Sequence, residues 1–563
     1  MKNKIISLIE HNVEGLSAND ISALIEIPPK PEMGDFAFPC FRLAKTMHKA
    51  PQLIAADIKD AIGDVDFLDD IQVQGAYLNF FVNKEIFVKS MVDTALADNF
   101  GSSDMGEGQT ICIDYSSPNV AKNFHVGHLR TTIIGNSLYK IFSKLGYKVV
   151  RINHLGDWGT QFGKLIVAYK AWGDEETVKR DGVAELMKLY VKFHEEAEKN
   201  PSLNDEARAW FTKMEHGDEE ALRIWQWFKD ISLIEYKRTY ELLGMDFDYY
   251  LGESFYRDKT DAVVKKLEDA NLLTESEGAK IVNLDEYDMA PCLILKNDGS
   301  TIYATRDLAA IFYRKETYNF SKCLYVTGQE QKLHFAQVFK VVELLGNDWA
   351  KDQLVHIPYG LVSLEGAKLS TRSGNVIYAE DILLEAISKI KEIIEEKNPN
   401  IPDKEETAKK IGVGAVLFND LYNQRIKDVS FKWEKLLNFD GETGPYVQYT
   451  YARCSSIIRK VDDFVAGNDI DYSLLTDAES LDLLKEISRF PKVVVDASEK
   501  YEPSVVARFA VDVAQAFNKF YNTNRINVEE KNVRDARMTM VHLTRKTIKD
   551  ALLLLGIECP EQM

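Results

Sequence analysis

The sequence predicts an α/β protein built on a parallel sheet, preceded by a small α+β domain and followed by an all-α bundle. The parallel sheet is indicated by a strand, loop, helix and second strand over about 45 residues, the length of a βαβ unit. The bundle is indicated by helical hydrophobic spacing in the last part of the chain. With 563 residues, 45% of them hydrophobic and 28% charged, the chain can form several globular cores.

The βαβ unit begins with an apolar strand at 110–114. A polar loop at 116–128, an amphipathic helix at 129–147 and a second strand at 148–154 follow. Such crossovers are right-handed, and ligands bind beyond the carboxyl ends of the strands, where this loop is expected to lie. Two more strands of the same sheet are predicted, at 321–328 and 354–360.

Shifts in composition divide the chain into four predicted parts. These are an N-terminal additional domain at 1–105, an α/β domain at 106–380, a helical connective region at 381–435 and a C-terminal helical domain at 436–563. A helical insertion at about 173–223 carries 14 acidic and 8 basic residues, which is typical of a solvated face. Because the final bundle has its own amphipathic helices, a chain that ends near residue 435 is expected to keep a folded α/β core.

Charge and cysteine content exclude several classes of protein. Lys plus Arg is 69 and Asp plus Glu is 88, which gives a net charge of −19. This excludes nucleic-acid binding by bulk charge but allows a local basic face. The six cysteines form no C-x-x-C pair, so neither a zinc ribbon nor a disulfide framework is expected. No apolar run reaches the ~20 residues of a membrane span, and we expect a cytoplasmic monomer without membrane or DNA partners.

The loop at 116–128 ends in His125-Val126-Gly127-His128, at the start of a predicted helix. A helix N-terminus offers free N–H groups and the positive end of the dipole, which favour phosphate. Two imidazoles three residues apart can donate to a triphosphate, and Gly127 allows a nucleotide to approach the backbone. Two histidines at a helix start are, however, more often capping or metal-binding residues, so this motif alone leaves the function open.

A second polar motif, KLSTRSGNV at 368–376, follows a strand and precedes a helix. Lys368, Ser370, Thr371 and Arg372 give a dense set of donors, and such a loop suits a pyrophosphate leaving group. A solvated turn is the simpler interpretation. The chain has no G-x-x-x-x-G-K-S/T motif, so a P-loop is excluded.

The two motifs together resemble the signatures of class I aminoacyl-tRNA synthetases, whose catalytic domain is Rossmann-like, and the surrounding sequence resembles the arginyl-tRNA synthetase family in particular. The N-terminal PEMGDFAFP (31–39) is also similar to that family's extra domain. The other segments that carry the resemblance are SSPNVAKNFHVGHLRTTIIGNSL (116–138), NHLGDWGTQFG (153–163), YATRDLAA (303–310), QKLHFAQVF (331–339), GPYVQYTYAR (444–453) and EPSVVARFAVDVAQAFNKFYN (502–522).

The resemblance implies arginine activation with ATP and transfer to tRNA(Arg), usually only once the tRNA is bound. It implies Mg²⁺ bound with ATP, without a dedicated protein metal site. His125, Val126, Gly127, His128, Lys368 and Ser370 would bind ATP. The family's loop often has a lysine where this chain has Thr371. Lys122, just upstream of His125, would replace it, and Lys368 and Arg372 would share that catalytic role.

The arginine pocket needs carboxylates and flat acceptors, because a guanidinium is planar, charged and has five donors. Tyr303 and Asp307 are i, i+4 and share one face if the segment TRDLAAIFYR is helical. The resemblance assigns them and Glu253 to the guanidinium. It assigns the α-amino and α-carboxylate end to Asp114, Asn119 and Gln331. The competing interpretation of Asp307 is a helix cap, and that of His154 is a core or supporting residue.

The C-terminal region is expected to contact tRNA. Residues 481–549 contain 13 Lys/Arg and 9 Asp/Glu, a local excess of four positive charges. Interleaved aromatic residues could stack on splayed bases, although most are expected in the bundle core. Alternative hypotheses are a small-molecule nucleotidyltransferase, which leaves the bundle unexplained, and an inactive synthetase paralogue, which the missing loop lysine favours and both histidines oppose. A cysteine-specific synthetase would need a zinc site that the sequence lacks.

Overall fold

The computed structural model describes residues 1–13, 15–364, 367–368 and 378–563. The chain forms two compact units. The larger contains 101–456, 490–514 and 545–563, and the smaller contains 1–100, 457–489 and 515–544.

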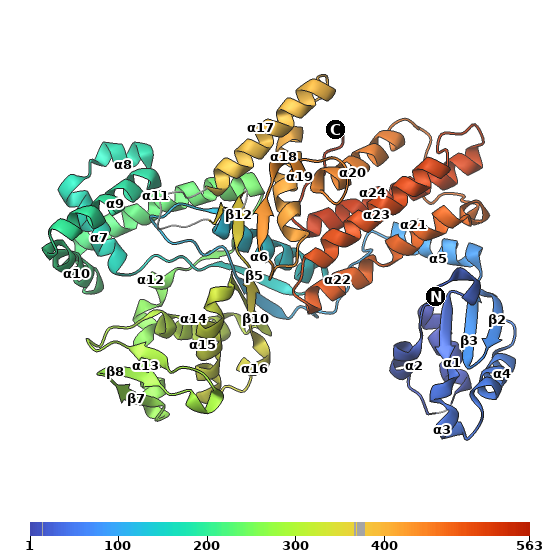
Figure 1. Cartoon of the computed structure of the whole chain (residues 1–563), viewed down its shortest axis with the longest axis horizontal. Coiled ribbons are helices and arrows are strands. Elements are labelled where there is room, and N and C mark those ends of the chain that lie inside the picture. Colours follow the sequence, from blue (N-terminus) through green and yellow to red (C-terminus); the bar gives the residue numbers. More distant parts are fainter. Residues whose placement is uncertain (14, 365–366, 369–377) are drawn as a thin grey trace. The chain divides into compact units, whose positions relative to one another are not determined.

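The larger unit is built on a five-stranded sheet in the order β11-β10-β4-β5-β6, and every neighbouring pair is parallel. Its strands are β4 (Thr110–Asp114), β5 (Lys148–Asn153), β6 (Tyr249–Tyr250), β10 (Lys322–Gly328) and β11 (Leu354–Tyr359) (Figure 1). The βαβ unit and both additional strands are therefore confirmed. β4 and β10 are central because their residues are apolar on both faces, which suits a strand covered on both sides.

Helices cover both faces of this sheet. The helices α14 (Tyr303–Tyr318) and α15 (Lys332–Leu344) share a hydrophobic core with Cys112, Val150 and Ile152 of the sheet. Successive strand residues face opposite sides, so Arg151 points to the other face. There its guanidinium lies 4.7 Å from the ring of Tyr139 in α6 (Val126–Lys144), which places α6 on that face.

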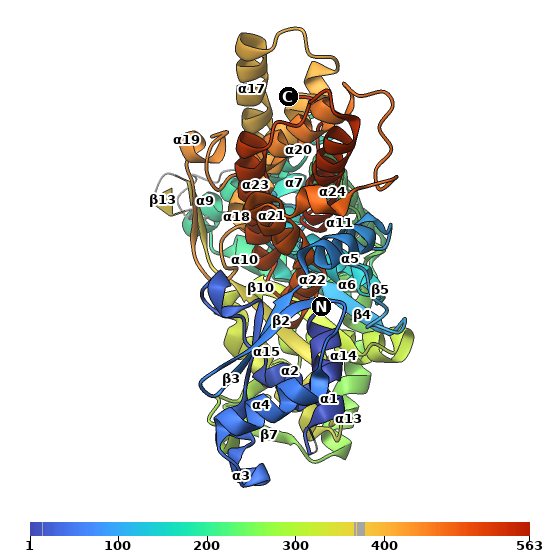
Figure 2. The same cartoon turned by 90° about the vertical axis from the view of Figure 1, so that its right-hand side faces the viewer.

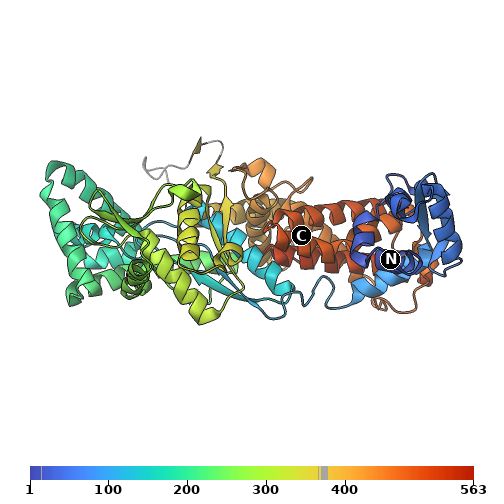
Figure 3. The same ribbon diagram turned by 90° about the horizontal axis from the view of Figure 1, so that it is seen from below.

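The acidic region at 173–223 is helical, as predicted. The helices that contain or flank it are α7 (Thr160–Trp172), α8 (Glu175–Asp181), α9 (Val183–Lys199), α10 (Ser202–Glu215) and α11 (Glu219–Leu243) (Figure 3). They share one core, which includes Trp158, Phe162, Phe193 and Trp210. Exposed Lys–Glu pairs at i, i+3 and i, i+4 spacing cover the outer surface of α8 and α9.

The larger unit also contains short strands that the sequence did not reveal. Those of two small sheets are β7 (Leu273–Ser276), β8 (Ala279–Val282) and β9 (Cys292–Leu295), then β12 (Val362–Leu364), β13 (Ala367–Lys368) and β14 (Val429–Phe431). They are too short for an alternating pattern to stand out. The connecting helices are α12 (Glu253–Tyr256), α13 (Thr260–Asp269), α16 (Ala350–Gln353), α17 (Ala379–Lys397), α18 (Lys404–Leu421) and α19 (Trp433–Leu436).

The smaller unit contains an antiparallel sheet in the order β1-β3-β2, packed against helices (Figure 2). Its strands are β1 (Phe36–Pro39), β2 (Leu68–Gln74) and β3 (Tyr77–Val82), and its N-terminal helices are α1 (Lys2–Asn12), α2 (Ala18–Leu24), α3 (Ala44–Met47), α4 (Pro51–Ile62) and α5 (Lys84–Leu96). The α+β prediction is confirmed. Pro51 stands at the first turn of α4, where its missing N–H breaks no hydrogen bond.

The C-terminal region is helical, as predicted. Its helices are α20 (Gly444–Ile458), α21 (Ala478–Ser488), α22 (Phe490–Glu499), α23 (Ser504–Thr523) and α24 (Lys531–Leu554). Residues 490–514 and 545–563 belong to the larger unit, where Ser137 of α6 donates to the carbonyl of Leu554 at 2.8 Å and Lys144 pairs with Asp550. A chain that ends near residue 435 would lack these parts of the larger unit, and the expectation that it keeps a folded α/β core stays a prediction.

No helix in the described part of the chain is long and apolar enough to cross a bilayer.

Candidate active site

The loop between β4 and α6 lies at the carboxyl ends of the parallel strands, as predicted. Ser116, Ser117 and Ala121 have φ of 70°, 44° and 59°, which non-glycine residues adopt only when the surroundings hold them. The hydroxyl of Thr131 accepts from the amide of Ser116 at 3.2 Å. Ser232 of α11 accepts from the amide of Ala121 at 2.9 Å. The loop is thus held in one strained conformation by helices on both sides.

The two motif histidines cap the N-terminus of α6. Nδ1 of His125 accepts from the amide of Gly127 at 3.1 Å, and Nδ1 of His128 accepts from the amide of His125 at 3.3 Å. The rings are stacked, with centroids 3.9 Å apart. Capping is therefore correct for these residues, but it leaves both Nε2 atoms for another partner.

Both imidazoles are neutral at physiological pH. Burial lowers the pKa of His125, and the charge of Lys122 lowers it further. Burial also lowers the pKa of His128 well below its usual value, assisted by His125 and Lys122. A neutral imidazole whose Nδ1 accepts must carry its proton on Nε2. The pair therefore presents two Nε2–H donors at a helix N-terminus.

Gly127 makes this stacking possible. A Cβ at Gly127 would stand 2.9 Å from Cε1 of His125, so the absent side chain makes room for the ring of His125 itself. From the sequence, Gly127 is expected to let a nucleotide approach the backbone at this position. Lys122 lies close enough to lower both histidine pKa values, and burial lowers its own pKa. Val126 is buried beneath the turn.

The second motif approaches the first through its flanks. Ser370, Thr371 and Arg372 lie outside the described residues, and of Lys368 only the backbone, in β13, is described. Beyond the second motif, Tyr378 forms an antiparallel bridge with His125. The amide of Ala379 donates to the carbonyl of Phe124 at 2.9 Å. The chain thus returns from the second motif directly to the first histidine.

Asp114, at the end of β4, is paired inside the protein. Its Oδ2 lies 2.8 Å from the guanidinium of Arg314 in α14, and Ser117 donates to its Oδ1 at 2.8 Å. Arg314 is completely buried and also approaches Nδ1 of His154 at 3.3 Å. His154 is therefore a supporting residue of this cluster. The backbone of Asn119 forms a parallel bridge with Gly156, two residues after His154.

Glu253 opens α12, and its amide donates to the carbonyl of Leu155 at 3.0 Å. Its carboxylate faces Arg306 of α14 at 3.3 Å, and both side chains are 10% exposed. Burial raises the pKa of Glu253 to about 8, although Arg306 opposes the rise. The guanidinium of Arg306 in turn lies 5.0 Å from the ring of Tyr303, the first residue of the helix.

Asp307 is not a helix cap. Tyr303 and Asp307 lie within α14, as predicted, and Ile302 precedes the helix without a side-chain cap. Oδ2 of Asp307 accepts from Nε2 of His334 in α15 at 2.6 Å. The negative charge of Asp307 adds to the raised pKa of Glu253, whose main cause is burial. Gln331 is exposed just before α15 and is not brought into hydrogen bonding with the other described pocket residues.

Sequence reasoning missed Arg306, Arg314 and His334, which contact three of the predicted carboxylates. Arg306 and Arg314 lie in the same helix as Asp307, at positions that a helical pattern assigns to the buried face. An arginine on the buried face of a helix is expected to pair with a carboxylate, but the helical pattern does not say which carboxylate.

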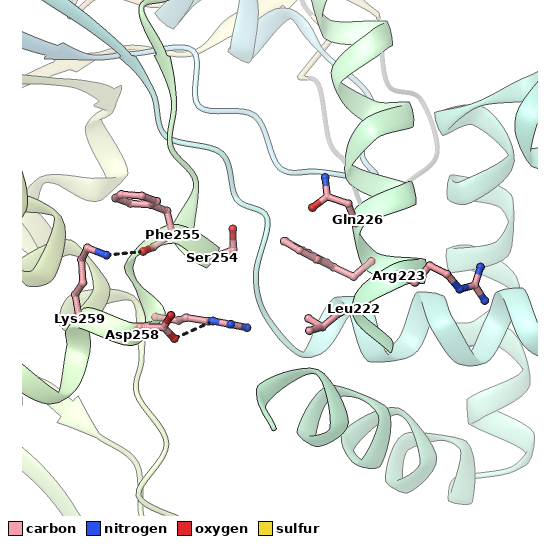
Figure 4. Close-up of a pocket in the computed structure, with 9 residues that line it drawn as sticks. Leu222, Arg223, Gln226, Ser254, Phe255, Asp258 and Lys259 are labelled. Atoms are coloured by element: carbon pink, nitrogen blue, oxygen red, sulfur yellow. Dashed lines mark hydrogen bonds and ion pairs between the residues drawn. The ribbon is translucent and has the colours of Figure 1, made fainter. Parts of the chain in front are cut away.

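An open cavity of about 570 Å³ lies next to Glu253, between α11 and the residues that follow Glu253 in and after α12 (Figure 4). Ser254, the neighbour of Glu253, lines it, and its hydroxyl donates to Asp157 at 2.7 Å. Lys229 pairs with the same carboxylate at 2.6 Å. Asp157 therefore ties the cavity wall to the insertion helices. The remaining lining residues are Leu222, Arg223, Trp225, Gln226, Phe255, Arg257, Asp258 and Lys259.

Three family descriptions match consecutive parts of the chain. Residues 3–82 match the arginyl tRNA synthetase N terminal domain, 91–433 match tRNA synthetases class I (R), catalytic domain, and 447–563 match the DALR anticodon binding domain.

Relatives and solved structures agree with these matches. The chain is 54% identical to the arginine–tRNA ligases of Alkaliphilus metalliredigens and Clostridioides difficile, over all of this chain and 99% of each relative. The solved arginyl-tRNA synthetase of Thermus thermophilus superposes with a TM-score of 0.80 at 25% identity over 96% of both chains. That of Plasmodium falciparum gives 0.80 at 24% identity over 100% and 99%, a likeness of fold.

Proposed function

The chain belongs to the arginyl-tRNA synthetase family, and we propose that the site at the carboxyl ends of its parallel strands activates L-arginine with ATP and charges tRNA(Arg). The arginine carboxylate attacks the α-phosphorus of ATP, which gives arginyl-adenylate and releases pyrophosphate. A hydroxyl at the 3′ end of tRNA(Arg) then takes the arginyl group, and AMP leaves.

The stacked, neutral His125–His128 pair carries this proposal. Its two Nε2–H groups and the N-terminus of α6 are donors fixed in advance, so they stabilise phosphate charge without reorganisation during the reaction. Lys122 adds the cation that the second motif lacks at Thr371. Lys368, Ser370 and Arg372 contribute to holding the departing pyrophosphate, and Val126 and Gly127 support the nucleotide.

The arginine side chain is assigned to Glu253, Tyr303 and Asp307. Two carboxylates and one aromatic ring match a charged planar group with five donors. The amino-acid end is assigned to Asp114, Asn119 and Gln331. Arg314 offsets the charge of Asp114.

The remaining roles follow from the domain order. We assign tRNA contact to 1–105, catalysis to 106–380 with its insertion, connection to 381–435 and anticodon binding to 436–563. Magnesium enters bound to the ATP phosphates as part of the substrate. We expect the protein to act as a cytoplasmic monomer, without DNA or membrane partners.

The test is ATP–pyrophosphate exchange with each amino acid, with and without total tRNA. We expect exchange with arginine only, negligible without tRNA and strong with it. Arginine-independent exchange, or exchange with another amino acid, would contradict the assignment. Full exchange without RNA would favour the small-molecule nucleotidyltransferase, and no exchange from folded protein would favour an inactive paralogue.

A further inference from the structure

The pocket assigned to the guanidinium already contains a guanidinium. Arg306 lies on the carboxylate of Glu253 and over the ring of Tyr303, so it touches two of the three residues assigned to the substrate's side chain. It is the immediate neighbour of the third, Asp307, in α14. A resident arginine and the substrate arginine would therefore use the same partners.

The resident contact is geometrically poor. The closest atoms, Nε of Arg306 and Oε2 of Glu253, are 3.3 Å apart. Both are buried and both lack a hydrogen-bond partner in the part of the chain that the structure describes. Buried charged groups left without hydrogen bonds are costly, whereas a forked guanidinium–carboxylate pair is among the strongest contacts in proteins. The free protein thus leaves binding energy at Glu253 that an incoming guanidinium can use.

Asp307, the third assigned residue, is engaged elsewhere, because His334 of α15 holds its carboxylate at 2.6 Å.

We propose that Arg306 is a substrate-mimicking latch that occupies Glu253 and Tyr303 in the free protein and leaves them when arginine binds. This inference rests on the assignment of Glu253 and Tyr303 to the substrate guanidinium. A ligand without a guanidinium cannot replace the latch with an equal contact, so the latch sets specificity as well as affinity. It acts by competition and is displaced before the reaction, so it is not a catalytic residue.

The experiment measures binding of L-arginine and of methylguanidinium to the full chain by calorimetry, with total tRNA present. Methylguanidinium lacks the amino-acid end and reports only on the side-chain pocket. Arg306→Met removes the charge and keeps an unbranched chain. If the latch is closed in about nine of ten molecules, its removal tightens both apparent Kd values about tenfold.

Arg151→Met is the matched control. Arg151 also pairs with a carboxylate, Asp248 at 2.7 Å, and lies over a tyrosine ring, but it contacts none of the pocket residues. We expect its arginine affinity to equal that of the wild type. The double variant Arg306→Met/Glu253→Gln should bind no tighter than Glu253→Gln alone, because the competition runs through Glu253.

Arg306→Lys gives a second test with a variant that keeps the positive charge. An ammonium cannot form the forked guanidinium contact, so the latch is weakened and arginine affinity should rise, by less than in Arg306→Met. Unchanged or weaker arginine binding by the folded variants would overturn the latch. Failure of the proposed function itself is a different result, since wild-type protein would then show no arginine-dependent exchange at all.

Discussion

Among individual side chains, Lys122 has the clearest expected effect. Its charge meets phosphate charge that grows in the transition state, so Lys122→Ala should lower kcat far more than it weakens arginine binding. Loss of one such donor costs ~10²–10³ in rate. Exchange kinetics separate kcat from arginine KM. A near-wild-type Lys122→Ala beside an inactive Lys368→Ala would place the compensating cation in the second motif instead.

Asp307 is the carboxylate on which charge recognition depends. Asp307→Asn keeps the size and the position beside His334 but removes the negative charge. We expect a loss of roughly 3–5 kcal/mol, or ~10²–10⁴ in kcat/KM for arginine, on the scale of breaking a buried pair. The gap between arginine and uncharged citrulline should narrow, because citrulline no longer leaves a carboxylate unpaired. Unchanged arginine KM would assign the guanidinium to Glu253 alone.

Glu253 should couple arginine binding to proton release. Burial raises its pKa to about 8 even with Arg306 beside it, so at neutral pH the free protein holds much of it protonated. A substrate guanidinium that forms the hydrogen-bonded pair which the Arg306 contact lacks favours the ionised carboxylate more strongly, so arginine affinity should rise with pH up to about 8. Calorimetry in buffers of different ionisation enthalpy measures the released proton. Glu253→Gln is the control and should release none; an equal release from both proteins would contradict this assignment.

Among helices, α6 should show pH-dependent stability. Folding lowers the pKa values of His125 and His128 from their usual 6.5. At a pH below about 6.5, the unfolded chain therefore binds more protons than the folded protein. Their contribution is therefore present above pH 6.5 and is lost as pH falls below it. Urea unfolding between pH 5 and 8 measures this slope. His125→Asn keeps an N-cap without titrating and should flatten the slope; an unchanged slope would assign it to other groups.

Gly127→Ala tests the packing of the same helix start. The added methyl group must displace the ring of His125, and overpacking of this kind costs about 1–3 kcal/mol. We expect reduced kcat with little change in arginine KM, because the arginine pocket lies on α12 and α14. Gly108→Ala controls for a destabilising substitution away from the site, because Gly108 has open surroundings but a φ of +70° that an added side chain strains. Wild-type kcat in Gly127→Ala would show that the stacked geometry is dispensable.

For the complete molecule, tRNA binding should weaken as salt increases. The total charge of −19 opposes RNA, so binding depends on local cations such as the excess of four in 481–549. Phosphate contacts release counterions, and log K should fall linearly with log salt. Filter binding over a salt series measures the slope. A flat response would show that RNA binding does not use a basic face.

Much of this protein could be predicted because its signals are local. The period of the hydrophobic residues gives α6, the apolar runs give β4, β5 and β10, and four consecutive residues contain both capping histidines. Backbone hydrogen bonds within a helix or turn depend on neighbours in the chain, so residue order is sufficient to predict them. The motifs then identify the family, and with it the chemistry.

Contacts between distant segments came only from the folded chain. Asp114 meets Arg314, Glu253 meets Arg306, and Asp307 meets His334 because separate helices pack on the carboxyl end of one sheet. The same packing brings the end of the chain into the α/β core, through the bond from Ser137 to Leu554. Many arrangements of the same helices satisfy their periodicity equally well. Which charges become neighbours is therefore decided by how whole elements pack, and no local pattern encodes it.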